Sequence, residues 1–114
     1  MARGDWAEEL ACRYLRKQGY LIVARNWRWR GGEVDIIAKD GNTLVFVEVK
    51  SRRSTEHGSP EEAVDARKRV HLWNSARAYL GGRLGEVKIR FDVVGVGPWG
   101  IRHVRGAFGA EDVR

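Results

Sequence analysis

The sequence predicts one α/β domain built on a mixed β-sheet, and three observations support this fold class. Helical and strand patterns follow one another in the order helix, three strands, helix, two strands. The length of 114 residues is typical of one domain, and the chain contains no repeat, linker or low-complexity segment. Hydrophobic residues make up 43% of the chain, enough for a modest core. We expect residues 1–114 to form a single domain with a flexible tail over 109–114.

The chain begins with signals for a helix and then a strand. Asp5 and Glu8 have the spacing of a capping box and predict a helix over about residues 6–18. Gly19 is a suitable residue to end that helix. Residues 20–24 are rich in strand-forming types, so a strand should follow directly.

A hairpin is predicted next. Residues 27–30 either continue the first strand or form an arm, and a second strand is expected over about 34–38. Asp40-Gly41 is a strong hairpin turn signal. The third strand, over 43–50, is apolar on both faces until its end, which favours a buried position in the middle of the sheet.

The second half predicts one helix and two strands. Ser59-Pro60 provides an N-cap and a proline at the first helical position, and Gly81-Gly82 closes the helix. The expected elements are a polar loop over 51–58, a helix over 59–80, a strand over 87–96 and a short last strand near 101–104.

Charge and cysteine content narrow the functional classes. The 21 Lys and Arg residues exceed the 15 Asp and Glu residues, giving a formal charge of +6 that favours polyanionic partners, although a soluble surface with a basic bias is an equal alternative. Arg dominates, which leans mildly toward nucleic acid. Cys12 is the only cysteine, so an internal disulfide and a Cys-rich zinc site are excluded. Without a signal-like or membrane-length apolar run, we expect a cytoplasmic protein with no membrane partner.

Two acids and a lysine are predicted to meet at the end of the hairpin. Side chains two apart share a strand face, so Glu48 and Lys50 point the same way. Counting back from the Asp40-Gly41 turn places Asp35 near the level of Glu48. Two carboxylates and an ammonium group would then converge at the end of a mostly apolar sheet.

Such a cluster suits phosphodiester hydrolysis. Neighbouring carboxylates repel unless a cation joins them, and Mg²⁺ prefers carboxylate, carbonyl and water oxygens. Asp35, Glu48 and the Val49 carbonyl could hold it, while Lys50 could orient a water or stabilise charge. A solvated, salt-bridged hairpin end is the simpler explanation of such residues. The apolar run that leads into them and the basic composition shift the balance toward a site.

Glu8 is a third candidate acid. It shares a helix face with Ala11, Cys12 and Leu15, the face expected to pack inward. Geometry alone favours its other role, as the capping-box partner of Asp5, and the two roles compete for one carboxylate.

Several ordered motifs resemble a known family over nearly all of residues 4–108. The chain resembles the YraN-like family, uncharacterised protein family 0102, which is similar to archaeal Holliday-junction resolvases of the restriction-endonuclease-like PD-(D/E)XK superfamily. The motifs include Gly4-Asp5-Trp6-Ala7-Glu8, Gly19-Tyr20, Arg25-Asn26, Gly32-Glu33-Val34-Asp35-Ile36-Ile37-Ala38, Val45-Phe46-Val47-Glu48-Val49-Lys50-Ser51-Arg52, Gly58-Ser59-Pro60-Glu61-Glu62-Ala63-Val64 and Arg90-Phe91-Asp92-Val93-Val94.

This resemblance implies a restriction-endonuclease-like three-layer fold and a DNA nuclease site that uses Mg²⁺ or Mn²⁺. Asp35 and Glu48 match the superfamily's acidic metal ligands, Lys50 its catalytic lysine, and Glu8 the helix glutamate of the resolvases. The superfamily's proline before the aspartate is replaced by Val34, as is usual in resolvase-like members, and Gly106 stands where the family often has Asn.

Further basic residues are candidates for nucleic-acid binding. Arg52, Arg53 and Lys68 flank the predicted site in sequence and could hold phosphates. Arg28 and Arg30 alternate with tryptophans in a segment that could stack on bases, although core or dimer contacts are equally expected of those tryptophans.

Other polar residues have simpler interpretations. We read Glu33 as a residue that shapes the strand entry, and we expect none of the three histidines to bind zinc. Asp92 is interpreted as a structural acid, with a site-supporting role left open.

Three functional hypotheses follow. The first is a metal-dependent endonuclease for structured or branched DNA, in which Asp35 and Glu48 hold the metal, Lys50 acts on the water or phosphate, and Glu8 assists. The second is a non-catalytic nucleic-acid-binding module with the same fold. The third is an interaction protein with a tryptophan-rich surface. A homodimer is expected only by analogy with the symmetry of DNA junctions.

Overall fold

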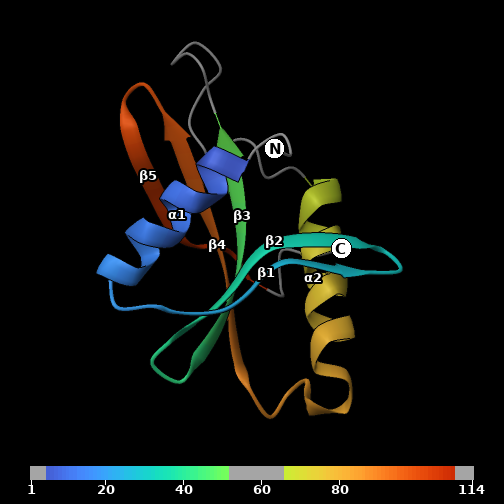
Figure 1. Cartoon of the computed structure of the whole chain (residues 1–114). Coiled ribbons are helices and arrows are strands. Elements are labelled where there is room, and N and C mark those ends of the chain that lie inside the picture. Colours follow the sequence, from blue (N-terminus) through green and yellow to red (C-terminus); the bar gives the residue numbers. More distant parts are fainter. Residues whose placement is uncertain (1–4, 52–65, 110–114) are drawn as a thin grey trace.

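In the part of the chain that the structure describes, two helices and a five-stranded mixed sheet form three layers (Figure 1). The computed structural model describes residues 5–51 and 66–109. The elements are α1 (Asp5–Lys17), β1 (Leu21–Trp29), β2 (Gly32–Asp40), β3 (Thr43–Ser51), α2 (Ala66–Leu80), a 3₁₀ turn (Gly81–Arg83), β4 (Lys88–Gly97) and β5 (Gly100–Phe108). This αβββαββ order confirms the predicted fold class and is consistent with a restriction-endonuclease-like architecture.

The sheet has the order β1-β2-β3-β4-β5, with β3 in the middle. β3 and β4 are parallel, whereas the other neighbouring pairs are antiparallel. A parallel pair needs a crossover connection, and α2 lies in the segment that joins these two strands. The central position of β3 was predicted from its two-sided apolar sequence, and the structure confirms it: Leu44–Glu48 are all buried.

Each sheet face has its own hydrophobic core. On one face α1 contributes Ala11, Cys12 and Leu15, which pack with strand residues such as Ile36 and Val47. The inward face predicted for this helix is therefore correct. Burial also raises the pKa of the Cys12 thiol, which keeps it protonated at neutral pH. The opposite core is formed under α2 by residues that include Leu72, Ala76, Phe46 and Phe91.

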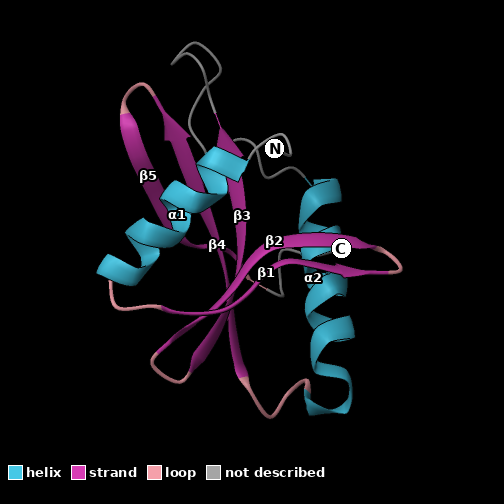
Figure 2. Ribbon diagram, viewed as in Figure 1, coloured by secondary structure: helices cyan, strands magenta, loops and turns pink. Residues whose placement is uncertain are grey.

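The tryptophan-containing segment continues β1 and packs on α2. Trp29 Nε1 donates a 2.8 Å hydrogen bond to Ser75 Oγ, and the Trp27 ring meets Tyr79 edge-on at 5.2 Å. Figure 2 shows the β1–β2 hairpin crossing α2 in this region. Both tryptophans are half-buried. The structure therefore favours the core interpretation over a platform for stacking bases.

Several predicted boundaries differ from the observed ones. β2 extends the predicted 34–38 at both ends, because its first residues pair with β1 and its last two pair with β3 beside the turn. β5 reaches Phe108, well beyond the predicted end near residue 104, by way of a bulge at Gly106. The predicted polar loop beyond Ser51, the predicted helix start over 59–65 and the predicted tail beyond residue 109 lie outside the described residues. Neither described helix is long and apolar enough to cross a membrane.

The entry to β2 predicts a measurable stability effect. Gly32 has a φ of +148°, and a Cβ atom placed on it would overlap the His71 ring. We expect Gly32→Ala to lower the free energy of unfolding by about 2–3 kcal/mol, through overpacking and backbone strain. Gly41→Ala is the matched control: its φ is +62° but its Cβ would meet open space, so about 1 kcal/mol is expected. Equal losses in urea unfolding would contradict the proposed steric overlap.

Candidate functional site

Strands β2 and β3 separate at the position of the predicted acids. Their pairing runs from Asp40–Thr43 beside the turn to Ile36–Val47, and stops there. β2 then continues with β1 across α2 (Figure 2). Asp35 is the next residue of β2, at the level of Glu48 on β3, as counting from the turn predicted.

Asp35 is fixed at this separation by the backbone of β3. Its Oδ2 atom accepts a 2.8 Å hydrogen bond from the Val49 N–H. The carboxylate therefore satisfies a backbone donor that has lost its neighbouring strand. Strand separation and a short acidic side chain together position Asp35 between the two strand ends.

The site strongly disfavours negative charge. Burial and the adjacent Glu48 raise the pKa of Asp35 to about 8, against the lowering effect of the Val49 hydrogen bond. Glu8, on α1, adds to the rise, so α1 also directs an acid toward this region. Glu48 itself is only 8% exposed. Carboxylates so placed are costly unless a cation accompanies them.

Two lysines supply positive charge beside Glu48. Lys68 Nζ, at the start of α2, lies 3.2 Å from Glu48 Oε2. Lys50 Nζ lies 4.0 Å from the same oxygen, and about a quarter of its side chain is exposed. Lys50 thus combines proximity to the acids with access from solvent, which a residue acting on a substrate requires.

The donor set fits a magnesium-like ion. Asp35 and Glu48 place carboxylate oxygens, which are hard ligands, around the strand separation, and the Val49 carbonyl could complete the set. Within 5–51 and 66–109, no three His, Cys, Asp or Glu side chains are grouped closely enough to hold a metal by themselves. Mg²⁺ commonly uses one or two carboxylates and completes its shell with waters and substrate phosphates, so two acids suffice.

The other predicted binding residues are dispersed. Arg28 is exposed and pairs with Glu33 at 3.4 Å, while Arg30 is exposed in the β1–β2 turn. Lys68 lies at the site itself, where it pairs with Glu48. Arg52 and Arg53 lie outside the described residues.

Glu33 supports the strand entry, in agreement with the structural interpretation. Its carboxylate pairs with Arg28, and its backbone oxygen lies 3.1 Å from His71 Nε2. Both contacts tie the start of β2 to its neighbours.

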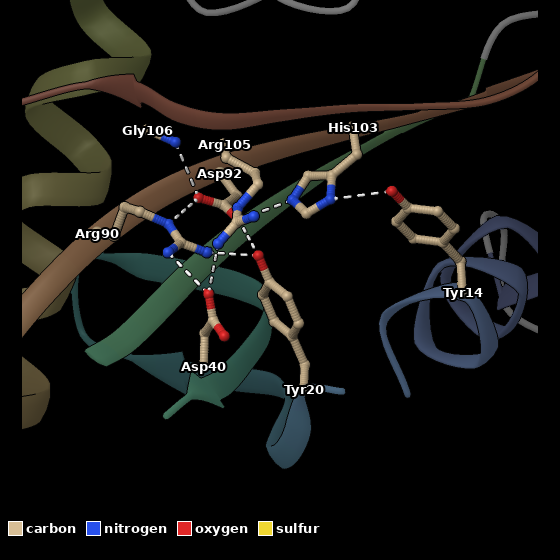
Figure 3. Close-up of polar contacts among 8 residues, drawn as sticks. All are labelled: Tyr14, Tyr20, Asp40, Arg90, Asp92, His103, Arg105 and Gly106. Atoms are coloured by element: carbon tan, nitrogen blue, oxygen red, sulfur yellow. Dashed lines mark hydrogen bonds and ion pairs between the residues drawn. The ribbon is translucent and has the colours of Figure 1, made fainter. Parts of the chain in front are cut away.

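A second polar cluster, which the sequence did not predict as such, surrounds Asp92 on the α1 side of the sheet (Figure 3). Asp92 is fully buried and accepts hydrogen bonds from Arg90 Nε at 2.8 Å, the Gly106 N–H at 3.1 Å and the Tyr20 hydroxyl at 3.1 Å. His103 Nε2 lies 2.7 Å from its Oδ2. Burial alone would raise the pKa of Asp92, but the contacts with His103, Arg90 and Gly106 lower it to about 2.

The Asp92 cluster connects four elements. His103 Nδ1 lies 3.2 Å from the Tyr14 hydroxyl of α1, and Arg90 and Arg105 both reach Asp40 at the end of β2. Figure 3 shows these side chains converging from α1, β2, β4 and β5. Asp92 is thus a structural acid. The position of Asp92 between Phe91 and Val93 in a predicted strand indicated that the acid has a buried partner. The sequence did not indicate which residue that partner is.

Comparison with known proteins places the chain in a family. The model of "Uncharacterised protein family UPF0102" matches residues 7–96. The chain belongs to this family. It is 47% identical over 110 residues to the UPF0102 protein of Syntrophomonas wolfei, covering 92% of this chain and 96% of that one. It is 50% identical over 97 residues to the UPF0102 protein of Symbiobacterium thermophilum, covering 83% and 81%. Family membership agrees with the resemblance found in the sequence, and the matched span contains all four candidate catalytic residues.

Proposed function

We propose that the protein is a divalent-metal-dependent endonuclease that hydrolyses phosphodiester bonds in structured or branched DNA. One observation carries the proposal: Asp35 and Glu48 share a mostly buried space where two strands separate, with Lys50 beside them. A structural ion pair needs only one acid, whereas here a second, buried acid, Glu48, raises the pKa of Asp35. Two adjacent acids suit a divalent cation.

Each residue has a role that follows from its position. Asp35, oriented by the Val49 N–H, and Glu48 would hold Mg²⁺ or Mn²⁺ together with the Val49 carbonyl. When bound, such an ion neutralises a phosphate and lowers the pKa of water. Lys50 would face the scissile phosphate and stabilise the negative charge that develops during attack. Glu8 would assist from α1 by orienting water.

DNA is the proposed substrate because the positive net charge and the sequence motifs both favour a nucleic acid. The formal charge of +6 attracts a polyanion, and the motifs resemble those of Holliday-junction resolvases in the PD-(D/E)XK superfamily. The sheet-and-two-helix architecture is compatible with that superfamily. Action on junctions would suit a homodimer, since a four-way junction presents two symmetric strands.

The test is a cleavage panel of linear, flapped, single-stranded and four-way DNA in Mn²⁺. We expect cleavage of at least one branched substrate, and Lys50→Ala should slow it about a hundredfold or more, because a charge close to the developing oxyanion is lost. Lys17→Ala is the matched control, an exposed lysine in the last turn of α1. Equal activity in wild type and Lys50→Ala would indicate a contaminating nuclease.

A non-catalytic nucleic-acid-binding module is the second candidate. The Lys68–Glu48 ion pair favours it, since an ammonium group already neutralises one acid of the site. The two functions differ in their metal dependence. A binding module should bind DNA equally well with EDTA or Mn²⁺. Asp35→Asn should leave its affinity unchanged at neutral pH, because the raised pKa keeps Asp35 largely protonated there.

Lys68 provides a further prediction about the metal. Because its Nζ lies 3.2 Å from Glu48, a cation bound there must compete with it. We expect Lys68→Met to tighten Mn²⁺ binding about threefold to tenfold in the absence of DNA. Isothermal titration calorimetry measures this, with Lys17→Met as the control for general charge. A weaker affinity in Lys68→Met would show that Lys68 supports the metal site.

A further inference from the structure

A pocket of about 490 Å³ lies at the end of the sheet away from the candidate catalytic residues. Its lining residues come mainly from the region of the β2–β3 turn, the end of α2 and the start of β4. Figure 1 shows these three elements at the foot of the view. Lys39 and Leu44 pair beside that turn, whereas Asp35 lies beyond the other end of the same strand pairing. The pocket is therefore separate from the acid cluster.

One part of the pocket lining is apolar or aromatic. Leu44, Val87 and Tyr79 contribute to it. The Tyr79 ring is held edge-on against Trp27 at 5.2 Å and Phe46 at 5.9 Å, so its position is fixed before any ligand binds. A rigid aromatic residue with aliphatic neighbours suits a flat ring such as a nucleobase.

The pocket lining also carries three cations and one acid. Lys39, Arg83 and Lys88 contribute positive charge, and Glu86 contributes a single negative charge. Among the residues that the structure describes, none of the three cations forms an ion pair, in contrast to Arg90 in the Asp92 cluster. The nearby carbonyl end of α2 disfavours anions, so these side chains must supply the attraction for one.

We propose that this pocket binds a nucleotide unit, with the base against Tyr79 and the phosphate between Lys39, Arg83 and Lys88. The ligand would be a free nucleotide or the phosphorylated end of a nucleic-acid strand, which share this chemistry. Three cations around one small pocket match a phosphate, and the ring beside them distinguishes a nucleotide from phosphate alone. The inference does not depend on the proposed cleavage activity.

The test is a titration of the full ¹⁵N-labelled chain, followed by NMR at low salt with EDTA. The probes are AMP, adenosine, inorganic phosphate, and a single-stranded tetranucleotide with and without a 5′-phosphate. We expect AMP to give saturable shifts at amides around residues 39–44 and 79–88. Adenosine and phosphate should each bind about tenfold more weakly, because each keeps only one part of the recognition.

Two variants separate the pocket from the general basic charge. Lys88→Glu should weaken AMP binding about tenfold, and the matched Lys17→Glu about twofold or less, since that exposed lysine lies on α1 outside the pocket. A phosphorylated tetranucleotide that binds more tightly than AMP identifies a strand end as the ligand, and the reverse order identifies a free nucleotide. The proposal fails if neither binds saturably, if phosphate binds as tightly as AMP, or if both variants weaken binding equally.

Discussion

Asp35→Asn is expected to abolish metal-dependent cleavage and at the same time to stabilise the protein. Asparagine can still accept the hydrogen bond from the Val49 N–H and can donate to Glu48, so the local geometry should persist. The substitution removes a charge that would ligate the cation, and cleavage should fall about a thousandfold or more. It also removes a carboxylate that burial and Glu48 make unfavourable.

The stabilising effect of Asp35→Asn has a defined pH dependence. The folded protein keeps the Asp35 proton up to a pKa of about 8, whereas the unfolded chain loses it near the ordinary aspartate pKa of 3.8. The wild type therefore loses stability as the pH rises from about 4 to about 8, and the asparagine variant lacks this contribution. At pH 8 we expect the variant to be more stable by about 2 kcal/mol in EDTA.

Urea unfolding at several pH values, with and without Mn²⁺, measures both effects. In Mn²⁺ the order should reverse, because the ion stabilises only a folded state that can bind it. Glu33→Gln is the control, an acid two residues away on the same strand whose carboxylate pairs with Arg28. A destabilised Asp35→Asn at pH 8 in EDTA would show that the carboxylate is structural.

Loss of the Asp92 carboxylate should cause the largest loss of stability. Asp92→Ala leaves the buried Tyr20 hydroxyl and the Gly106 N–H without their acceptor and separates His103 and Arg90 from the Asp92 carboxylate. Removing one partner from a buried charged network typically costs about 3–5 kcal/mol. The network joins α1, β2, β4 and β5, so the whole domain should unfold at lower urea concentration.

The wild-type protein should also show the Asp92 contribution as acid sensitivity. Because the pKa of Asp92 is lowered to about 2 from 3.8, its stabilisation is present above pH 4 and is lost as the pH falls toward 2. Asp40→Asn is the control for the half-exposed end of the same network, and about 1 kcal/mol or less is expected. If Asp92→Ala and Asp40→Asn lower the free energy of unfolding equally, Asp92 is not the main stabilising residue of the network.

The order of elements and the hairpin register could be predicted from local signals. The two-sided apolar sequence of β3 indicates its central position, and the Asp40-Gly41 turn fixes the register from which the level of Asp35 was counted. Glu48 and Lys50 follow directly, because they lie two apart on one strand. The acid-acid-lysine arrangement was therefore accessible from sequence.

The remaining features depend on contacts between distant segments. The sequence does not predict that β2 and β3 separate beyond the Ile36–Val47 pair, because this separation depends on the packing of the β1–β2 hairpin on α2. The partner of Trp29 is Ser75, which is 46 residues away. A bulge in the pairing of β4 with β5 brings His103 and Asp92 together. The spacing of residues in the sequence does not predict this contact.

Calorimetric titration with Mn²⁺ asks whether Asp35 and Glu48 share a cation before any DNA is present. We expect one binding event in wild type, its loss in Asp35→Asn and in Glu48→Gln, and near-normal binding in Glu33→Gln. Absence of Mn²⁺ binding in the folded wild type, or unchanged binding in both site variants, would contradict a cation site shared by Asp35 and Glu48.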